Sequence, residues 1–170
     1  MSKIILVTGG TRSGKSSYAE RLALRLAPNP VYLATARIWD EEFRQRVEAH
    51  RLRRGAQWTN VEEEKWLSAH DFGGRVVLVD CLTLWCTNFF FDLDSDIDRV
   101  EAVVCREVDA LVRQEATFVI VTNELGWGGT SDNALQRRFT DLQGKVNQYV
   151  AALADEVVLM VSGIPVKIKG

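Results

Sequence analysis

One segment near the start of the sequence combines the residue types that bind phosphate. It satisfies the pattern G-x-x-x-x-G-K-S/T at each fixed position. Glycines let the backbone wrap a phosphate with its N–H groups, the lysine reaches the β- and γ-phosphates, and the final hydroxyl binds Mg²⁺. Nucleotide binding is therefore predicted for Gly9, Gly10, Thr11, Arg12, Ser13, Gly14, Lys15 and Ser16. Lys15 is also a candidate catalytic residue, and we expect its side chain to be exposed.

A carboxylate that could help to hold the metal ion follows a later apolar run. Residues 76–79 are apolar, and Asp80 follows them directly. P-loop proteins place a metal-binding acid at the end of such a strand. An aspartate there can equally form a turn or cap a helix. The next apolar run ends in Thr122, Asn123 and Glu124, and this glutamate could position a water, act as a base or serve a turn. Ser16 and Asp80 are the candidate Mg²⁺ ligands.

A histidine set among arginines is the second feature that could do chemistry. Residues 40–54 carry acids in the first turn, arginines in the last turn and Gly55 beyond them, which predicts a helix. The imidazole of His50 is a good nucleophile toward phosphorus when neutral, and neighbouring guanidinium groups can neutralise phosphate oxygens. The alternative is a solvated helix with favourable end charges. We expect His70, the other histidine, at the surface.

The phosphate-binding segment, Asp80 and His50 can act together only if the fold brings them to one edge of a sheet. Short apolar runs rich in β-branched residues alternate with longer amphipathic stretches, which predicts an α/β fold. We expect it to be P-loop NTPase-like, with a mostly parallel central sheet flanked by helices on both faces. Predicted strands are residues 4–7, 31–33, 76–79, 118–121 and 157–161, with 57–62 extended and 165–169 as a possible edge. Predicted helices are residues 16–26, 40–54, part of 82–91, 97–114 and 133–153.

Composition excludes several classes of protein. The 170 residues are 46% hydrophobic and 26% charged, which fits a single domain over residues 1–170. With 21 basic and 23 acidic residues, the chain lacks the basic character of a nucleic-acid binder. It contains no apolar run long enough to span a membrane. Three cysteines without a C-x-x-C pair indicate neither a disulfide framework nor a zinc site. We expect a cytoplasmic protein.

Further short motifs extend from the phosphate-binding segment to the end of the chain. They are Thr8 to Ser16 with Ala19-Glu20, Tyr32-Leu-Ala-Thr-Ala36, Asp40-Glu-Glu42, Arg46, His50-Arg51, Trp58, Glu62, Val121-Thr-Asn-Glu-Leu-Gly126, Arg138-Phe139, Gly144-Lys-Val-Asn-Gln148, Ala154-Asp155 and Val161-Ser-Gly-Ile-Pro165. In order and spacing the chain resembles the bifunctional adenosylcobinamide kinase / adenosylcobinamide-phosphate guanylyltransferase family of cobalamin biosynthesis. Two places depart from the family pattern, namely Asp80, where many members have glutamate, and residues 126–131.

The resemblance implies two reactions. The first phosphorylates adenosylcobinamide with ATP or GTP. The second transfers GMP from GTP to adenosylcobinamide phosphate through a guanylylated His50, and it forms adenosylcobinamide-GDP. Nucleotide contacts are implied for Ala34, Thr35, Ala36, Arg51, Leu52, Arg53, Arg54, Glu62 and Asp80.

The resemblance also implies a homotrimer. Trp39, Trp58 and Trp127 could form an apolar wall beside the corrinoid, or they belong to the core. Two other functions compete with this interpretation. One is a P-loop small-molecule kinase without a covalent step, and the other is a non-enzymatic nucleotide-binding regulator.

Overall fold

The computed structural model describes residues 2–170, apart from the side chains of Arg46, His50 and Arg53. The strands are β1 (Lys3–Gly9), β2 (Val31–Ala34), β3 (Thr59–Glu62), β4 (Val76–Val79), β5 (Thr117–Val121), β6 (Glu156–Val161) and β7 (Ile164–Lys169). The helices are α1 (Lys15–Leu26), α2 (Glu41–Arg53), α3 (Leu82–Asp92), α4 (Ile97–Val112) and α5 (Ala134–Leu153), with short 3₁₀ helices η1 (Leu67–Ala69) and η2 (Gly126–Gly128).

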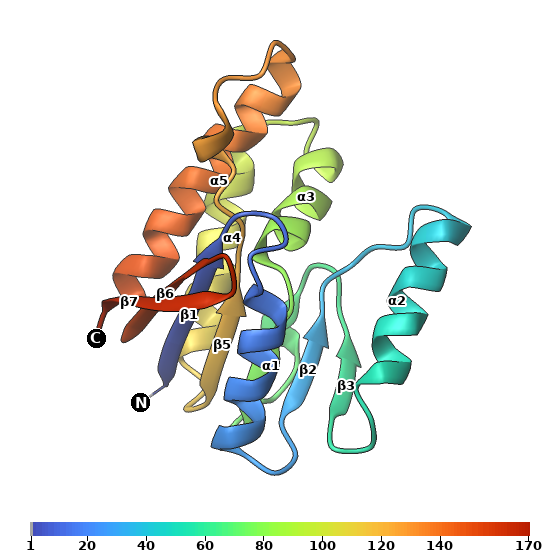
Figure 1. The fold of residues 1–170 in the computed structure, drawn as a ribbon. Helices are drawn as coiled ribbons and strands as arrows, with labels where there is room; N and C mark the ends of the chain where they lie inside the picture. Colours follow the sequence, from blue (N-terminus) through green and yellow to red (C-terminus); the bar gives the residue numbers. More distant parts are fainter. Residues whose placement is uncertain (1) are drawn as a thin grey trace.

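All of the strands join one sheet in the order β3-β2-β4-β5-β1-β6-β7 (Figure 1). Every neighbouring pair is parallel except β6 and β7, which form an antiparallel hairpin. The helices cover both faces of this sheet. The expected α/β fold with a mostly parallel sheet is therefore confirmed.

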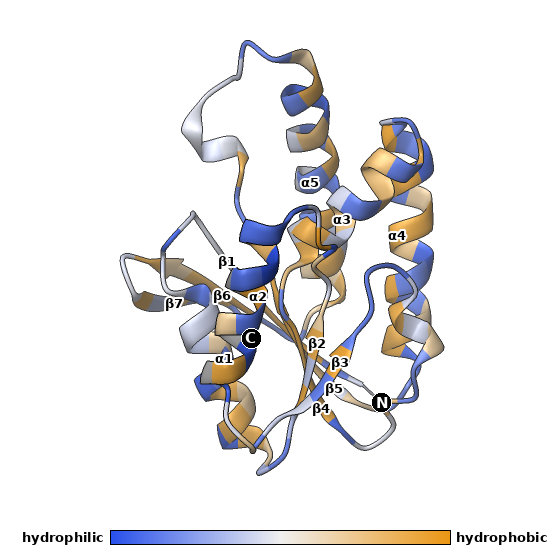
Figure 2. Ribbon diagram, turned by 90° about the vertical axis from the view of Figure 1, so that its right-hand side faces the viewer, coloured by the Kyte–Doolittle hydropathy of each residue, from blue (hydrophilic) through white to orange (hydrophobic). Residues whose placement is uncertain are grey.

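The core divides into two apolar clusters, one on each face of the sheet. One cluster packs alternate residues of the central strands against α3, α4 and α5. The other packs the intervening strand residues against Ala19 and Ala23 of α1. Because both faces are covered, the central strands are nearly continuous apolar runs, as parallel strands usually are. Figure 2 shows these strands mostly in hydrophobic colours.

Helix α2 differs from the other helices because none of its described residues belongs to either core cluster. Its ends are nevertheless well defined by the sequence. The Asp40 carboxylate accepts the backbone N–H of Phe43 at 2.7 Å and caps the first turn. Gly55, with a φ of 67°, follows the last turn. The expected helix over 40–54 is thus present, and it lies outside the packed body of the fold.

The two outer strands at opposite edges have the weakest sequence signals. β3 pairs with β2 in parallel, so the extended stretch expected at residues 57–62 is a strand. β7 confirms the edge strand expected near the end of the chain, and each of its residues is exposed. Between them, β4, β5 and β1 lie side by side. Their carboxyl ends meet at one edge, where ligands of such sheets bind.

Candidate nucleotide-binding site

The phosphate-binding motif forms a loop between β1 and α1 at the carboxyl edge of the sheet. Gly14 has a φ of 93°, and a Cβ there would lie 3.3 Å from the Cα of Gly163. A Cβ on Gly9 would lie 2.6 Å from the carbonyl oxygen of Met160. Gly163, in the β6–β7 turn, also donates its N–H to the carbonyl oxygen of Ser13 at 2.9 Å. Crowding by this hairpin therefore explains both glycines, and the hairpin braces the loop.

Lys15 is buried, with 7% of its surface exposed, so the expectation of an exposed lysine is wrong. Its Nζ donates to the carbonyl oxygen of Gly10 and, at 3.5 Å, to the hydroxyl of Ser13. The side chain therefore turns back under its own loop instead of extending into solvent. Burial lowers the pKa of Lys15 from its ordinary value. The ammonium group is thus held by oxygens of the phosphate loop.

Asp80 directly follows β4 and is oriented by a buried threonine. Its Oδ1 accepts the backbone N–H of Thr35 at 2.9 Å and the Thr35 hydroxyl at 2.8 Å. Burial raises the pKa of the Asp80 carboxyl, while the bonds from Thr35 and the charge of Arg54 act in the opposite direction. Thr35 is fully buried. Its hydroxyl also lies 2.9 Å from the backbone oxygen of Cys81, so Thr35 contacts both Asp80 and the residue after it.

A cavity of about 420 Å³ opens at this edge of the sheet. The sequence-predicted residues that line it are Thr11, Arg12, Lys15, Ser16, Ala34, Ala36, Arg54 and Asp80. Asn123 also lines it, at a strand end where the sequence places ligand contacts, and the lining residues that sequence reasoning missed are Tyr32, Phe43, Val47, Cys81, Leu84 and Val121. Gly9, Gly10, Ser13, Gly14, Thr35, Arg51, Leu52 and Glu62 do not line it. The phosphate loop, the metal-site candidates and one arginine of α2's C-terminal end thus share one cavity.

Two of the missed residues could have been found from strand geometry. Residues two apart in a strand face the same side of the sheet. Tyr32 stands two residues before Ala34, and Val121 stands two before Asn123, and each of these pairs lines the cavity. Phe43 and Val47 are four residues apart in α2, so they lie on one face of that helix, and both line the cavity. The remaining lining residues depend on which strands become neighbours.

An aromatic and cationic stack forms one wall of the cavity. The guanidinium carbon of Arg54 lies 3.6 Å from the centre of the Tyr32 ring. Behind it, Trp58 meets Tyr32 edge-on with ring centres 5.5 Å apart. Arg54 also donates to the side-chain oxygen of Asn60 at 3.2 Å. Burial raises the pKa of Tyr32, so its phenol stays neutral. Trp58 is 7% exposed and belongs to the core.

The remaining predicted residues of α2 lie away from the cavity or outside the description. Leu52 is 84% exposed. Arg51 lies 3.8 Å from Glu62, and both side chains are largely exposed. The predicted nucleophile His50 and the predicted contact Arg53 lie, as side chains, outside the described residues. The backbone of α2 is described over its whole length, so the position of the helix beside the cavity is established.

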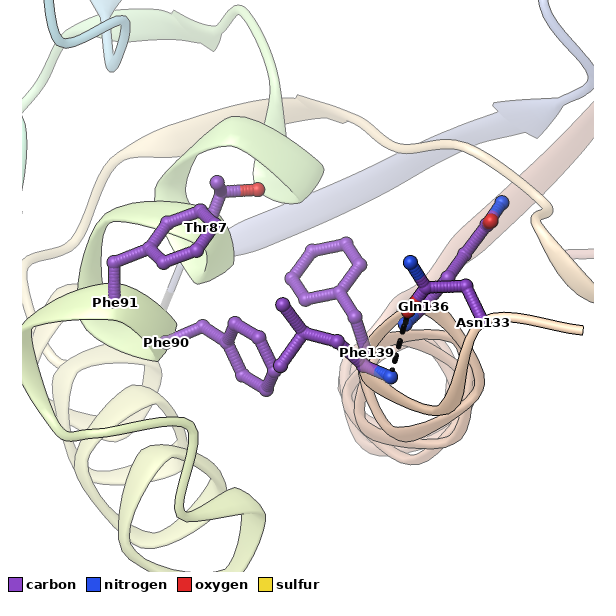
Figure 3. A pocket seen from close by; sticks show the side chains of 7 residues that line it. Thr87, Phe90, Phe91, Asn133, Gln136 and Phe139 are labelled. Atoms are coloured by element: carbon purple, nitrogen blue, oxygen red, sulfur yellow. Dashed lines mark hydrogen bonds between the residues drawn. The ribbon is translucent and has the colours of Figure 1, made fainter. Parts of the chain in front are cut away.

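Two further cavities lie near the start of α5. One, of about 440 Å³, is lined by residues of the segment ahead of α5 and of its first turns, among them Gly126, Ser131, Arg137 and Arg138. The other, of about 220 Å³, lies between α3 and α5 and is lined by Phe90, Phe91, Phe139 and Leu135 together with three polar residues (Figure 3). Trp127 and Trp39 are 68% and 54% exposed. They remain available to an apolar ligand, whereas Trp58 does not.

No described helix is long and apolar enough to cross a membrane. Within the described residues, no group of three or more histidine, cysteine, aspartate or glutamate side chains could hold a metal ion. Ser16 and Asp80 both line the cavity of about 420 Å³, so their side-chain oxygens are the ones there that could hold a magnesium ion. Mg²⁺ in such sites binds one or two protein oxygens and takes its other ligands from water and substrate phosphates.

Comparisons with known proteins identify the family of the chain. Residues 5–168 match the family described as cobinamide kinase / cobinamide phosphate guanyltransferase. The chain is 41% identical to the bifunctional adenosylcobalamin biosynthesis protein CobU of Escherichia coli (strain K12), over 98% of this chain and 99% of that protein. It is 40% identical to CobU of Salmonella typhimurium (strain LT2) with the same coverage. Identity to CobP of Pseudomonas aeruginosa is 38%, over 97% and 96%.

Solved structures share the fold at low sequence identity. One solved ATPase domain has a TM-score of 0.50 at 11% identity, covering 92% of this chain and 68% of that one. The P4 protein of bacteriophage phi6, solved in complex with ADP, has a TM-score of 0.50 at 14% identity, covering 96% and 52%. These similarities support a P-loop NTPase-like fold.

Proposed function

The chain belongs to the cobinamide kinase / cobinamide phosphate guanyltransferase family, and we propose that it carries out both reactions. In the first it phosphorylates adenosylcobinamide with ATP or GTP. In the second it transfers GMP from GTP to adenosylcobinamide phosphate, which forms adenosylcobinamide-GDP. The observation that most directly supports this proposal is the single cavity that Lys15, Ser16 and Asp80 share.

The kinase step uses the phosphate loop. The loop amides and Lys15 bind the β- and γ-phosphates and stabilise the charge that develops as the γ-phosphoryl group moves to the hydroxyl of the corrinoid's aminopropanol arm. Ser16 and Asp80 would hold Mg²⁺, which neutralises phosphate charge when it is bound with the nucleotide. The bonds from Thr35 fix one oxygen of Asp80, so the carboxylate is oriented before nucleotide arrives.

The guanylyl step uses the helix beside the cavity. The imidazole at position 50 attacks the α-phosphorus of GTP, a nitrogen–phosphorus bond forms, and pyrophosphate leaves. A phosphate oxygen of adenosylcobinamide phosphate then attacks the same phosphorus and frees the histidine. Position 50 follows Phe43 and Val47 at the i, i+4, i+7 spacing of one helix face. Both of those residues line the cavity, which supports a nucleophile at this position.

Labelling with GTP that carries a radioactive α-phosphate tests the covalent step. The wild-type protein should become labelled, and the bond should be labile in acid and stable in alkali. His50→Ala should lose labelling and guanylyl transfer but keep phosphorylation of adenosylcobinamide, because only the α-phosphate reaction needs the imidazole. His70→Ala is the matched control and should keep both activities. In the structure His70 stacks on Phe72 and lies 3.6 Å from Glu63.

The outcome also separates the competing functions. Phosphorylation of adenosylcobinamide without labelled protein would favour a kinase with no covalent step. Nucleotide binding without turnover would favour a regulator. Label found after peptide mapping on Lys15, His70 or another residue would overturn the assignment to His50.

We also infer a homotrimer and a cytoplasmic location. The trimer rests on the family resemblance. The location rests on the substrates, because GTP and ATP are supplied in the cytoplasm. The exposed Trp39 and Trp127 are the tryptophans that remain candidates for contact with the corrinoid.

A further inference from the structure

The chain beyond β5 stays bonded to β1 until it reaches the phosphate loop. The N–H of Thr122 donates to the carbonyl oxygen of Val7 at 3.0 Å, and the N–H of Glu124 donates to that of Gly9 at 3.1 Å. Gly9 is the first glycine of the loop. The backbone of Glu124 is therefore fixed against the segment that binds the nucleotide phosphates.

The carboxylate of Glu124 is oriented by a second bond to the same strand. Its Oε1 accepts the hydroxyl of Thr8 at 2.9 Å. Thr8 is 5% exposed and directly precedes Gly9. Among the described residues, no side chain or backbone donor bonds to Oε2. One oxygen of a half-buried carboxylate is thus anchored beside the phosphate loop, and the other is able to accept a proton.

A buried polar network from α5 holds the same segment from the other side. The Thr122 hydroxyl donates to the side-chain oxygen of Asn147 at 2.6 Å, and Gln143 donates to both of these groups. Asn147 in turn donates to the backbone oxygen of Asn123 at 3.0 Å. Thr122 and Gln143 are fully buried. Rigid support of this kind is what an acid–base group requires if it is to act at a defined place.

Along the sequence, Glu124 lies between residues that line two different cavities, and it is a lining residue of neither. Asn123, immediately before it, lines the nucleotide cavity of about 420 Å³. Gly126, two residues after it, lines the cavity of about 440 Å³ ahead of α5. Figure 1 shows the segment between β5 and α5 extending beyond the carboxyl edge of the sheet.

We propose that Glu124 is the general base of the kinase step. The acceptor hydroxyl oxygen attacks the γ-phosphorus, and a new oxygen–phosphorus bond forms. The bond from the γ-phosphorus to the bridging oxygen breaks, and the nucleoside diphosphate leaves. The hydroxyl proton passes to Oε2 of Glu124 and from there to water. This inference rests on the proposed function, because it assumes that an alcohol is the phosphoryl acceptor.

Glu124→Gln tests the proposal. The amide keeps an oxygen that can accept the Thr8 hydroxyl but cannot take up the proton. We expect kcat for phosphorylation of adenosylcobinamide to fall about 10²–10⁴-fold, with the KM for the nucleotide changed less than about twofold. Labelling of the protein by GTP at the α-phosphate should not change, because that reaction uses the imidazole. It also reports that the variant is folded and binds GTP.

Two more variants complete the design. Asp132→Asn removes an exposed carboxylate from the segment ahead of α5 and should leave kcat unchanged. Thr8→Val removes the orienting bond and should lower kcat less than Glu124→Gln does. Wild-type kcat in Glu124→Gln, with an active parent enzyme, would overturn the role of Glu124 and leave the proposed function intact. A parent enzyme that phosphorylates no adenosylcobinamide would contradict the proposed function and this inference with it.

Discussion

Asp80 combines two roles that a substitution can separate. Its Oδ1 accepts two bonds from Thr35, which help to hold the ends of β2 and β4 together. We propose that its charge also helps to hold the metal ion. Asp80→Asn keeps an oxygen for Thr35 and removes the charge, so the fold should be retained. We expect the Mg²⁺ concentration needed for half-maximal kinase activity to rise at least about tenfold, since a carboxylate is a much better Mg²⁺ ligand than an amide.

Titration of kinase activity with Mg²⁺ measures this change. Nucleotide binding with the metal chelated should match that of the parent protein, because the loop and Lys15 are unaltered. An unchanged Mg²⁺ dependence in Asp80→Asn would show that this carboxylate has no part in holding the ion.

At the scale of residues, the sequence predicts the phosphate loop well because its chemistry is local. Consecutive residues supply the glycines, the cation and the hydroxyl. The burial of Lys15 was missed, since it depends on how the loop closes over the side chain. Tyr32 and Val121 were missed as well, because each lines the cavity only once its strand has taken its place in the sheet.

Arg37 forms an ion-pair clamp that joins the segments after β2 and β3 to the end of α3. Its guanidinium group bonds both oxygens of Glu64, after β3, and both oxygens of Asp92, at the end of α3. Lys65 also reaches Asp92 at 2.6 Å. These cations hold the pKa of the Asp92 carboxyl well below its usual range. Because this clamp lies just before α2, it fixes the point from which that helix starts.

We expect Arg37→Gln to lower stability by roughly 2 kcal/mol, or the unfolding temperature by about 4–8 °C at neutral pH. The folded-state pKa of Asp92 is depressed below its unfolded value of about 3.9. The stability from this carboxylate is therefore present above that pH and is lost as the pH falls toward the folded-state value. The difference between parent and variant should shrink below about pH 4.

Thermal unfolding followed across this pH range measures the effect. Asp94→Asn is the control, because it removes a nearby exposed carboxylate outside the clamp. A difference between parent and Arg37→Gln that stays constant down to about pH 2 would show that the clamp does not depend on ionised Asp92.

At the scale of elements, the apolar runs predict the buried strands, since a strand covered on both faces must be apolar throughout. β3 was expected only as an extended stretch because its burial alternates, as befits an edge strand. The strand order could not be predicted. The insertion of β5 between β4 and β1 is a long-range pairing, and it is this insertion that brings Asn123 and Glu124 to the phosphate loop.

At the scale of the whole molecule, one cavity joins α1 with the ends of β2, β4 and β5. Because the cavity exists only in the folded protein, a ligand that occupies it binds the folded state and not the unfolded chain. GTP with Mg²⁺ at about one hundred times its Kd should therefore stabilise the protein by roughly 2.7 kcal/mol. For a chain of this size the unfolding temperature should rise by about 5–10 °C.

Calorimetry or dye-monitored melting over a series of GTP concentrations measures how the unfolding temperature depends on bound GTP. Lys15→Met should largely remove the rise, because it keeps the length of the side chain and removes the cation that meets the phosphates. A melting temperature indifferent to saturating GTP would mean that the cavity is not the nucleotide site.

The brace between the phosphate loop and the β6–β7 turn has a consequence for how this family can change over evolution. Gly14 and Gly163 are distant in the chain, yet a Cβ on Gly14 would lie 3.3 Å from the Cα of Gly163. Gly163 in turn has a φ of 81°, which a side chain disfavours. A Cβ on Gly163 itself would meet nothing within 4 Å, so its backbone conformation alone favours glycine there, whereas Gly14 is also crowded by Gly163. Both positions should therefore remain glycine among diverging relatives, so that the turn of the terminal hairpin changes no faster than the loop it supports.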